Sequence, residues 1–328
     1  MDTINCAIVG YGGIALFHTR AFLRIPGVRL RTVVGRRAEP AESFREAWGF
    51  ENATTRYEDV LTDPDIDAVI VSSPSEAHYE QTRLALEAGK NVLVEIPLAL
   101  THKGAAEIAG LAKKSGNKLL VAHTRRFNRT GRFVKDFIAN GEAGHVHQHH
   151  THEFQLRRDN VGWTGYRRSW TDDVLFHHGC HVLDYSLWTI DRPVRRIRGE
   201  LSPLDAGTGT SLDVSMLLRY ATETIAALSL SYSARSGVNN NIYLCDAGTL
   251  IVSGNRVTLN GETLFRSDDT LDDDVLVQNT EFIDSIRKDR QPECGAEQAL
   301  EALGLLQQVY DQSISLEGED KYKRMWET

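Results

Sequence analysis

The sequence predicts an α/β protein of two domains. Its 328 residues are more than one domain usually contains and are enough for two sizeable hydrophobic cores. Short apolar segments alternate with helical segments from residue 5 to residue 122. Such alternation indicates parallel strands joined by right-handed crossovers, with ligands at the carboxyl ends of the strands. We therefore expect one domain over residues 1–122 and a second over residues 123–328.

The composition narrows the class of protein. A hydrophobic content of 41% and a charged content of 25% are typical of a globular protein, and the net charge of −8 argues against non-specific binding to nucleic acid or to a membrane surface. The cysteines are far apart, so we expect reduced thiols and a cytoplasmic setting. We expect neither a signal peptide nor a membrane span, because no apolar run approaches the roughly 20 residues that a span needs.

A glycine-rich turn follows the first predicted strand, Asn5–Val9. Residues 10–15 read Gly-Tyr-Gly-Gly-Ile-Ala and open a helical pattern. In this context the first glycine makes a tight turn, the second lets a pyrophosphate approach the backbone, and the alanine lets helix and strand pack closely. The phosphates would lie at the helix N-terminus. The pattern predicts a Rossmann dinucleotide-binding domain whose cofactor contacts Gly10, Gly12, Gly13, Ile14 and Ala15.

The end of the second predicted strand, Leu30–Val34, indicates which dinucleotide binds. An NAD-binding domain usually carries Asp or Glu near this point, where it binds the ribose hydroxyls. Here Gly35 is followed by Arg36 and Arg37. A guanidinium suits a 2′-phosphate, so we predict that the cofactor is NADP and that both arginines contact it. The alternative is a pair of solvated arginines at a strand end.

Polar residues and prolines follow the next predicted strands, near residues 67–72 and 91–94. The carboxyl ends of parallel strands meet at one edge of the sheet, where ligands bind. We therefore add to the expected cofactor contacts Ser73, Pro74, His78, Glu95 and Pro97.

A cluster of histidines indicates the chemistry. In a helix His177, His181 and Asp184 share one stripe. A carboxylate one turn after a histidine can orient the ring and support its protonated form, as a general base requires. We expect His181 to be the base, with Asp184, His177 and His178 as its catalytic partners. Trp170, just upstream, is expected at the cofactor. The alternative is a helix with buried, hydrogen-bonded histidines.

A metal is the other interpretation of these histidines, because zinc binds three imidazoles and a water. Adjacent His177 and His178 would point about 100° apart on a helix, so they could not easily join His181 at one ion. We therefore expect no metal. A separate run between His145 and His152 is expected to form one exposed face of a strand with weak metal affinity.

Four segments occur in an order that resembles the glucose–fructose oxidoreductase/inositol dehydrogenase/MocA (Gfo/Idh/MocA) family: residues 10–15, 73–78 and 95–97 and the helix with His181 and Asp184. The resemblance implies an NAD(P)-dependent oxidoreductase acting on CH–OH groups. It also implies a C-terminal α+β domain with a large, open, mostly antiparallel sheet, through whose face the family forms homo-oligomers, here a dimer or tetramer. Residues 212–218 and 225–232 support a sheet independently, since apolar and polar side chains alternate there.

Two positions depart from the family pattern. The usual Glu-Lys-Pro triplet is Glu95-Ile96-Pro97, so the lysine that assists hydride transfer in many relatives is missing. The usual aspartate four residues before the catalytic histidine is His177. Only His181 and Asp184 match the family residue by residue.

Residues 94–99, 123–128 and 168–181 are similar to a narrower branch of the family. That branch oxidises a carboxylated cyclic hemiacetal to a lactone with NADP in aromatic catabolism. A hemiacetal hydroxyl is more acidic than a plain alcohol, so a histidine base can suffice without the lysine. An anionic substrate favours arginines, and we expect it to be bound by His123, Arg125, Arg126 and Arg168.

Two further functions stay open. One is a dehydrogenase or reductase of the same family acting on a sugar, sugar acid or cyclitol. The other is a non-catalytic NADP-binding sensor of redox state, although an oriented histidine base has no use in a sensor.

Overall fold

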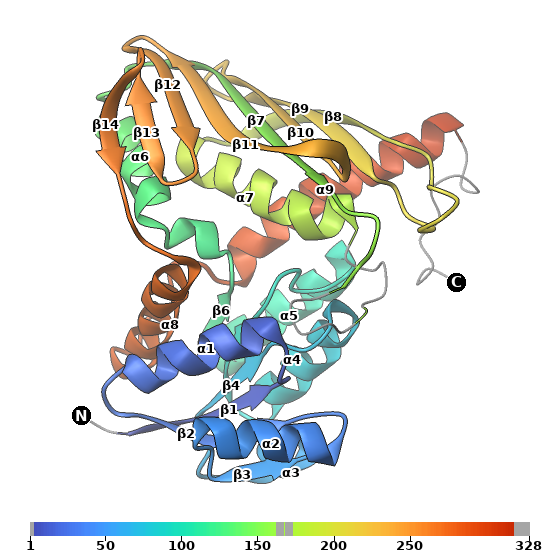
Figure 1. The fold of residues 1–328 in the computed structure, drawn as a ribbon, viewed down its shortest axis with the longest axis vertical. Helices are drawn as coiled ribbons and strands as arrows, with labels where there is room; N and C mark the ends of the chain where they lie inside the picture. The colour runs from blue at the N-terminus through green and yellow to red at the C-terminus, as the bar shows by residue number, and fades with distance from the viewer. Residues whose placement is uncertain (1–2, 162–166, 168–172, 318–328) are drawn as a thin grey trace. The chain divides into compact units, whose positions relative to one another are not determined.

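The computed structural model describes residues 3–161, 167 and 173–317. Contacts within the chain divide it into two units, each compact (Figure 1). The first holds Met1–Thr124 and Thr270–Leu300, and the second holds mainly Arg125–Asn160, Arg167–Asp269 and the chain from Glu301. We expected the boundary after residue 122, with the remainder of the chain in the second domain. The segment Thr270–Leu300 instead groups with the first unit.

The first unit contains a six-stranded parallel sheet in the order β3-β2-β1-β4-β5-β6. Its central strands are apolar and buried, as expected for a parallel sheet covered on both faces by helices. The order reverses between β1 and β4, which is where ligands bind in such sheets. The strands are β1 Ile4–Val9, β2 Val28–Val34, β3 Asn52–Thr54, β4 Ala68–Val71, β5 Asn91–Val94 and β6 Leu119–Val121.

The helices of this unit alternate with its strands, which confirms the predicted Rossmann fold. They are α1 Gly13–Arg24, α2 Ala38–Trp48, α3 Tyr57–Thr62, η1 Ser75–Ala77, α4 His78–Glu87 and α5 His102–Ser115. A further helix, α8 Leu271–Arg287, arrives from much later in the chain and packs against α1 (Figure 1). It begins at a capping box formed by Thr270 and Asp273.

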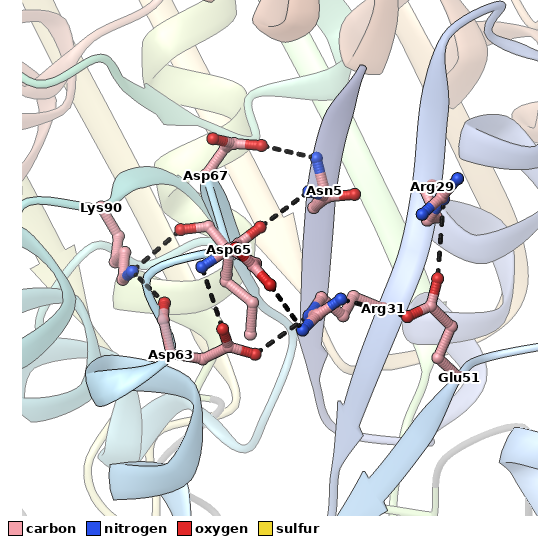
Figure 2. Close-up of polar contacts among 9 residues, drawn as sticks. Asn5, Arg29, Arg31, Glu51, Asp63, Asp65, Asp67 and Lys90 are labelled. Atoms are coloured by element: carbon pink, nitrogen blue, oxygen red, sulfur yellow. Dashed lines mark hydrogen bonds and ion pairs between the residues drawn. The ribbon is translucent and has the colours of Figure 1, made fainter.

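Ion pairs join residues at the amino ends of the strands of this sheet, opposite the edge where ligands bind. Figure 2 shows Arg31 of β2 reaching three carboxylates, with Nε 3.0 Å from Asp63 Oδ2, Nη2 3.0 Å from Asp65 Oδ2 and Nη1 3.2 Å from Glu51 Oε2. Lys90 Nζ donates to the carbonyl oxygens of Asp63 and Ile66. These residues lie toward the amino ends of the strands, away from the ligand edge, so we assign the network to stability.

The second unit contains an eight-stranded sheet in the order β14-β13-β12-β11-β7-β10-β9-β8. Every pairing is antiparallel except that of β7 with β10. This architecture confirms the expected mostly antiparallel sheet. The strands are β7 Val146–Leu156, β8 Val194–Leu201, β9 Asp213–Tyr220, β10 Ile225–Ser231, β11 Ser233–Cys245, β12 Gly248–Ser253, β13 Arg256–Leu259 and β14 Glu262–Arg266.

Three helices cover one face of this sheet: α6 Arg129–Ala139, α7 Gly179–Ile190 and α9 Ala296–Glu317 (Figure 1). In β9 Val214, Met216 and Leu218 are buried while Leu217 between them is 52% exposed, as the alternation predicted. Gly199 lets α9 approach, because a Cβ there would lie 2.6 Å from Val309 Cγ1.

The histidine run in β7 is not one exposed face. His147 is exposed, but His149 is fully buried, because the register of β7 against β11 shifts between Val146 and Gln148, which takes His147 out of the regular alternation of the strand. The prediction of an exposed stripe was therefore wrong for His149. Among the described helices, none is long and apolar enough to cross a membrane.

Candidate active site and cofactor site

The glycine turn after β1 has the geometry that a dinucleotide needs. Gly10 has φ +115°, and a Cβ there would lie 2.7 Å from the carbonyl oxygen of Ser72, which follows β4. Only glycine fits such a position. A Cβ at Gly12 would meet nothing within 4 Å, so space is open beside the first turn of α1. Ala15 is fully buried. The free amides of that turn, beginning at Gly13 and Ile14, can therefore receive a pyrophosphate.

The end of β2 carries two exposed arginines, Arg36 and Arg37, where the sequence predicted them. Gly35 is buried beneath Tyr11, whose Cε1 would lie 2.2 Å from a Cβ at that position. The side chains of Arg36 and Arg37 bring two positive charges to this edge, and the first turn of α1 carries no acidic side chain. This edge therefore suits an anionic group.

The loops after β4 and β5 are joined by His78. Its Nε2 lies 2.9 Å from the carbonyl oxygen of Ser73, and its Nδ1 lies 2.8 Å from that of Pro97. We had expected His78 to contact the cofactor, but its side chain is only 1% exposed and both ring nitrogens lie against carbonyl oxygens of these loops. Ser73 and Pro74 are half-buried, and the Ser73 hydroxyl donates to Gln81 Oε1 at 2.6 Å.

Glu95, directly after β5, accepts a hydrogen bond that the sequence did not suggest. His18 of α1 places Nε2 2.8 Å from Glu95 Oε1, and its Nδ1 lies 3.1 Å from Asn279 Oδ1 of α8. His18 is fully buried, whereas the Glu95 side chain keeps 14% exposure. From the sequence alone, a single histidine inside a helical pattern cannot be distinguished from an ordinary core residue.

The histidine cluster begins in a π-helical turn, Val174–His178 (η3), and α7 follows at once. The sequence predicted one regular helix. The rings of His177 and His181 lie 6.3 Å apart with their planes at 75°, so the predicted shared stripe is present. His178 faces the sheet, where its Nδ1 lies 3.0 Å from Gln155 Nε2 and its ring meets Tyr232 edge-on. Since Gln155 donates there, Nδ1 of His178 accepts.

Asp184 is held by Arg126. Its buried carboxylate accepts from Arg126 Nε at 2.9 Å and from Nη2 at 2.6 Å. We had expected Asp184 to act through His181 and Arg126 to meet the substrate. The two form a two-point ion pair with each other, so Arg126 also holds the residue that we expected to assist the base. They are 58 residues apart, so no local spacing reveals the contact.

Other predicted substrate contacts are also placed. Arg125 Nη2 lies 2.6 Å from Glu153 Oε2 of β7, another residue that sequence reasoning missed. His123 is buried and lies two residues after the end of β6 in the first unit. Arg168 and Trp170 lie outside the described residues. Within the described chain, His177, His178 and His181 do not bring three ligand atoms within 4.8 Å of one another.

Known proteins resemble both halves of the chain. Residues 4–123 match the family model described as "Oxidoreductase family, NAD-binding Rossmann fold", and residues 130–263 match "Bacterial oxidoreductases, C-terminal". The 4-carboxy-2-hydroxymuconate-6-semialdehyde dehydrogenase of Sphingobium sp. (strain NBRC 103272 / SYK-6) is 30% identical over 92% of this chain and 96% of its own.

Two further proteins extend the comparison. The scyllo-inositol 2-dehydrogenase (NADP(+)) IolW of Bacillus subtilis (strain 168) is 26% identical over 59% of this chain and 53% of its own. A solved structure of levoglucosan dehydrogenase in complex with NADH and levoglucosan superposes with a TM-score of 0.86 at 16% identity, covering 96% of this chain and 98% of that one. At such identity this last likeness shows the fold alone.

Proposed function

Because the chain belongs to the Gfo/Idh/MocA oxidoreductase family, we propose that it oxidises a carboxylated cyclic hemiacetal of the 4-carboxy-2-hydroxymuconate-6-semialdehyde type to a lactone. The chain is an NAD(P)-dependent oxidoreductase acting on CH–OH groups. The observation that carries the choice of substrate is the likeness to the Sphingobium semialdehyde dehydrogenase, which covers nearly the full length of both chains. We place the reaction in the breakdown of aromatic compounds.

NADP is the proposed cofactor. Arg36 and Arg37 follow β2, where an NAD-binding domain usually carries an acid, and both side chains are exposed to a ligand. A guanidinium pairs with a phosphate through short, charge-assisted hydrogen bonds. A bound NADP would supply the hydride acceptor for the oxidation.

His181 is the proposed base for the hydroxyl proton. Its Nδ1 is buried, so Nε2 is the nitrogen that can reach a substrate. The ring of His177 lies 6.3 Å from that of His181, and His178 is oriented beside them by Gln155, so both histidines lie next to the proposed base. The buried ion pair between Arg126 and Asp184 holds the buried side of α7 in place. We propose that this pair positions the helix that carries the base.

The chemistry of a hemiacetal fits the residue at position 96. Ile96 is buried and apolar, so it cannot stabilise a forming alkoxide as the family's lysine does. A hemiacetal hydroxyl loses its proton more readily than a plain secondary alcohol does. A histidine base can then serve without an ammonium group.

A sugar, sugar-acid or cyclitol substrate is the second candidate. The observation in its favour is the set of further relatives, which includes scyllo-inositol 2-dehydrogenase and the D-glucoside 3-dehydrogenase of Escherichia coli (strain K12). Such substrates are neutral or carry one carboxylate. Their charge therefore distinguishes them from the substrate of the first candidate reaction.

We also propose that the chain forms a dimer or tetramer through the sheet of the second unit. Helices cover one face of that sheet in Figure 1, and the other face exposes large apolar side chains, including Leu156 at 58% and Leu217 at 52%. A cytoplasmic setting belongs to the same proposal, supported by four cysteines that all lie in the described chain and form no disulfide.

Product analysis tests the proposed reaction. The enzyme is incubated with the semialdehyde substrate and NADP, and the product is identified by mass spectrometry while NADPH is followed by absorbance. We expect one lactone per NADPH. An open-chain acid as the first product, or NADPH formation without lactone, would contradict the hemiacetal route.

A further inference from the structure

Two buried histidines hold the turn Glu95–Pro97 in the first unit. The turn follows β5 and continues its ladder, because Glu95 N donates to the carbonyl oxygen of Val71 at 3.0 Å. His18 of α1 reaches the first residue of the turn, and His78 of α4 reaches the last. Both rings are almost fully buried, at 0% and 1% exposure. The turn is therefore supported from two helices at once.

The His78 ring has an acceptor at each nitrogen. The carbonyl oxygen of Pro97 lies 2.8 Å from Nδ1, and that of Ser73 lies 2.9 Å from Nε2. A backbone carbonyl can only accept a hydrogen bond. A neutral imidazole has one donor and one acceptor nitrogen, so it would leave one of these contacts between two acceptors. Only the doubly protonated ring makes both bonds.

The His18 ring is in the same situation. Its Nε2 lies 2.8 Å from Glu95 Oε1 and its Nδ1 lies 3.1 Å from Asn279 Oδ1. The Asn279 amide is set in this orientation by its Nδ2, which lies 3.5 Å from the carbonyl oxygen of His18. Rotating the amide would place two oxygens against each other. The remaining ring neighbour is Phe22, stacked at 6.5 Å, so Glu95 is the one charged group that these contacts bring to His18 within the described chain.

We propose that His18 and His78 are positioning residues that each donate from both ring nitrogens and so fix the Glu95–Pro97 turn, with Asn279 orienting His18. The functional part rests on the proposed function, with NADP as the cofactor and with Glu95 and Pro97 as cofactor contacts that the sequence predicts. His18 lies five residues after Gly13, the first residue of α1, which is about 7.5 Å along the helix axis. A proton on His18 then balances the Glu95 carboxylate close to the place where the cofactor phosphates bind.

A third buried histidine provides an internal control. His149 in the second unit also has a partner at each ring nitrogen, but Ser186 Oγ, 2.9 Å from Nδ1, is a hydroxyl that can donate. A neutral ring satisfies both contacts there. Burial also lowers the pKa of His149 to about 3, in agreement with a neutral ring.

Nitrogen-15 NMR of the histidine-labelled full chain at pH 7 tests the protonation directly. The variants His18→Gln, His78→Gln and His149→Gln assign the signals. We expect His18 and His78 each to show two hydrogen-bearing ring nitrogens and His149 to show one. A hydrogen-free nitrogen in the His18 or His78 ring would overturn the proposal for that residue.

Direct binding of NADPH, followed by its fluorescence, tests the positioning. Asn279→Leu removes the acceptor of His18 and should weaken NADPH binding about 5- to 10-fold, the equivalent of roughly one hydrogen bond. Asn279→Asp keeps an acceptor oxygen and should restore binding to within about twofold. Equal binding by Asn279→Leu and the wild type would contradict the positioning role.

The two proposals fail separately. The NMR measurement needs no turnover, so an enzyme inactive on every substrate offered would refute the proposed reaction and leave the two-donor rings intact. A hydrogen-free nitrogen in an enzyme that makes the lactone would refute the rings alone.

Discussion

The Arg126 guanidinium holds the Asp184 carboxylate at two points, with Nε 2.9 Å from Oδ2 and Nη2 2.6 Å from Oδ1. The Asp184 side chain is 1% exposed and the Arg126 side chain 10%. Two charges at such depth are tolerated because each neutralises the other, and removing one leaves the other buried without compensation.

Arg126→Leu should therefore destabilise the protein by about 3 kcal/mol, since breaking a buried pair typically costs 3–5 kcal/mol. Urea unfolding measures the free energy of unfolding of each variant. Replacing Asp184 with Leu in the same chain should recover much of the loss. The matched control is Arg125→Leu, whose side chain is 28% exposed and whose pair with Glu153 should contribute less. Equal small losses from both single variants would contradict the account.

His181→Ala should lower kcat by about 10² to 10⁴, the usual effect of losing a general base, while the Kd for NADPH stays unchanged. Steady-state turnover assays measure kcat, and titration followed by NADPH fluorescence measures the Kd. His147→Ala is a suitable control, because that ring is exposed and pairs with Asp246 on the surface. Near-wild-type turnover by His181→Ala would remove this residue from the mechanism.

Arg36→Ala should lower kcat/KM for NADP by about 10-fold or more and leave the value for NAD almost unchanged, because a charge-assisted bond to phosphate contributes about 1.5–3 kcal/mol. Arg29→Ala is the control on the same strand, since Arg29 pairs with Glu51 near the opposite end of β2 (Figure 2). A wild-type enzyme that uses NAD as efficiently as NADP would refute the cofactor assignment.

Acid should weaken the fold through His149. Burial, opposed by the hydrogen bond to Asn241, lowers the pKa of His149 to about 3 from an ordinary value of 6.5. The unfolded chain then binds a proton that the native chain does not, so stability is complete above pH 6.5 and falls as the pH drops toward 3. This one group accounts for about 2 kcal/mol between pH 6.5 and 5.

His149→Gln keeps hydrogen-bonding groups but cannot titrate. The variant should have a lower free energy of unfolding than the wild type at pH 7. Its free energy of unfolding should also fall less between pH 7 and pH 5, as measured by urea unfolding at both pH values. If the free energy of unfolding falls equally in both proteins between pH 7 and pH 5, His149 does not cause the loss of stability in acid.

Local patterns predicted what local geometry decides. The glycine turn at Gly10 and Gly12, the alternation in β9 and the stripe shared by His177 and His181 each depend on residues within a few positions of one another. The positive φ of Gly10 and the close approach of Ser72 explain why the glycine pattern was informative.

Contacts between distant segments were not predictable in this way. His18 and Glu95 are 77 residues apart, and Arg126 and Asp184 are 58 apart. Each pair meets only because the topology brings its two segments together. The return of α8 to pack against α1 has the same origin. The π-helical turn at Val174–His178 was missed because a short apolar and histidine-rich run has the same composition in either kind of helix.

The most direct test of the proposed function is a comparison of kcat/KM with NADP for three substrates: the cyclic hemiacetal of 4-carboxy-2-hydroxymuconate-6-semialdehyde, scyllo-inositol and a glucoside. An enzyme whose histidine base works without the family's lysine should oxidise the more acidic hemiacetal hydroxyl at least about 100-fold more efficiently than the plain hydroxyls of neutral polyols. We predict that the carboxylated hemiacetal exceeds both by that factor or more. A kcat/KM for scyllo-inositol or the glucoside equal to or above that of the hemiacetal would contradict the proposal and assign the enzyme to neutral sugars or cyclitols.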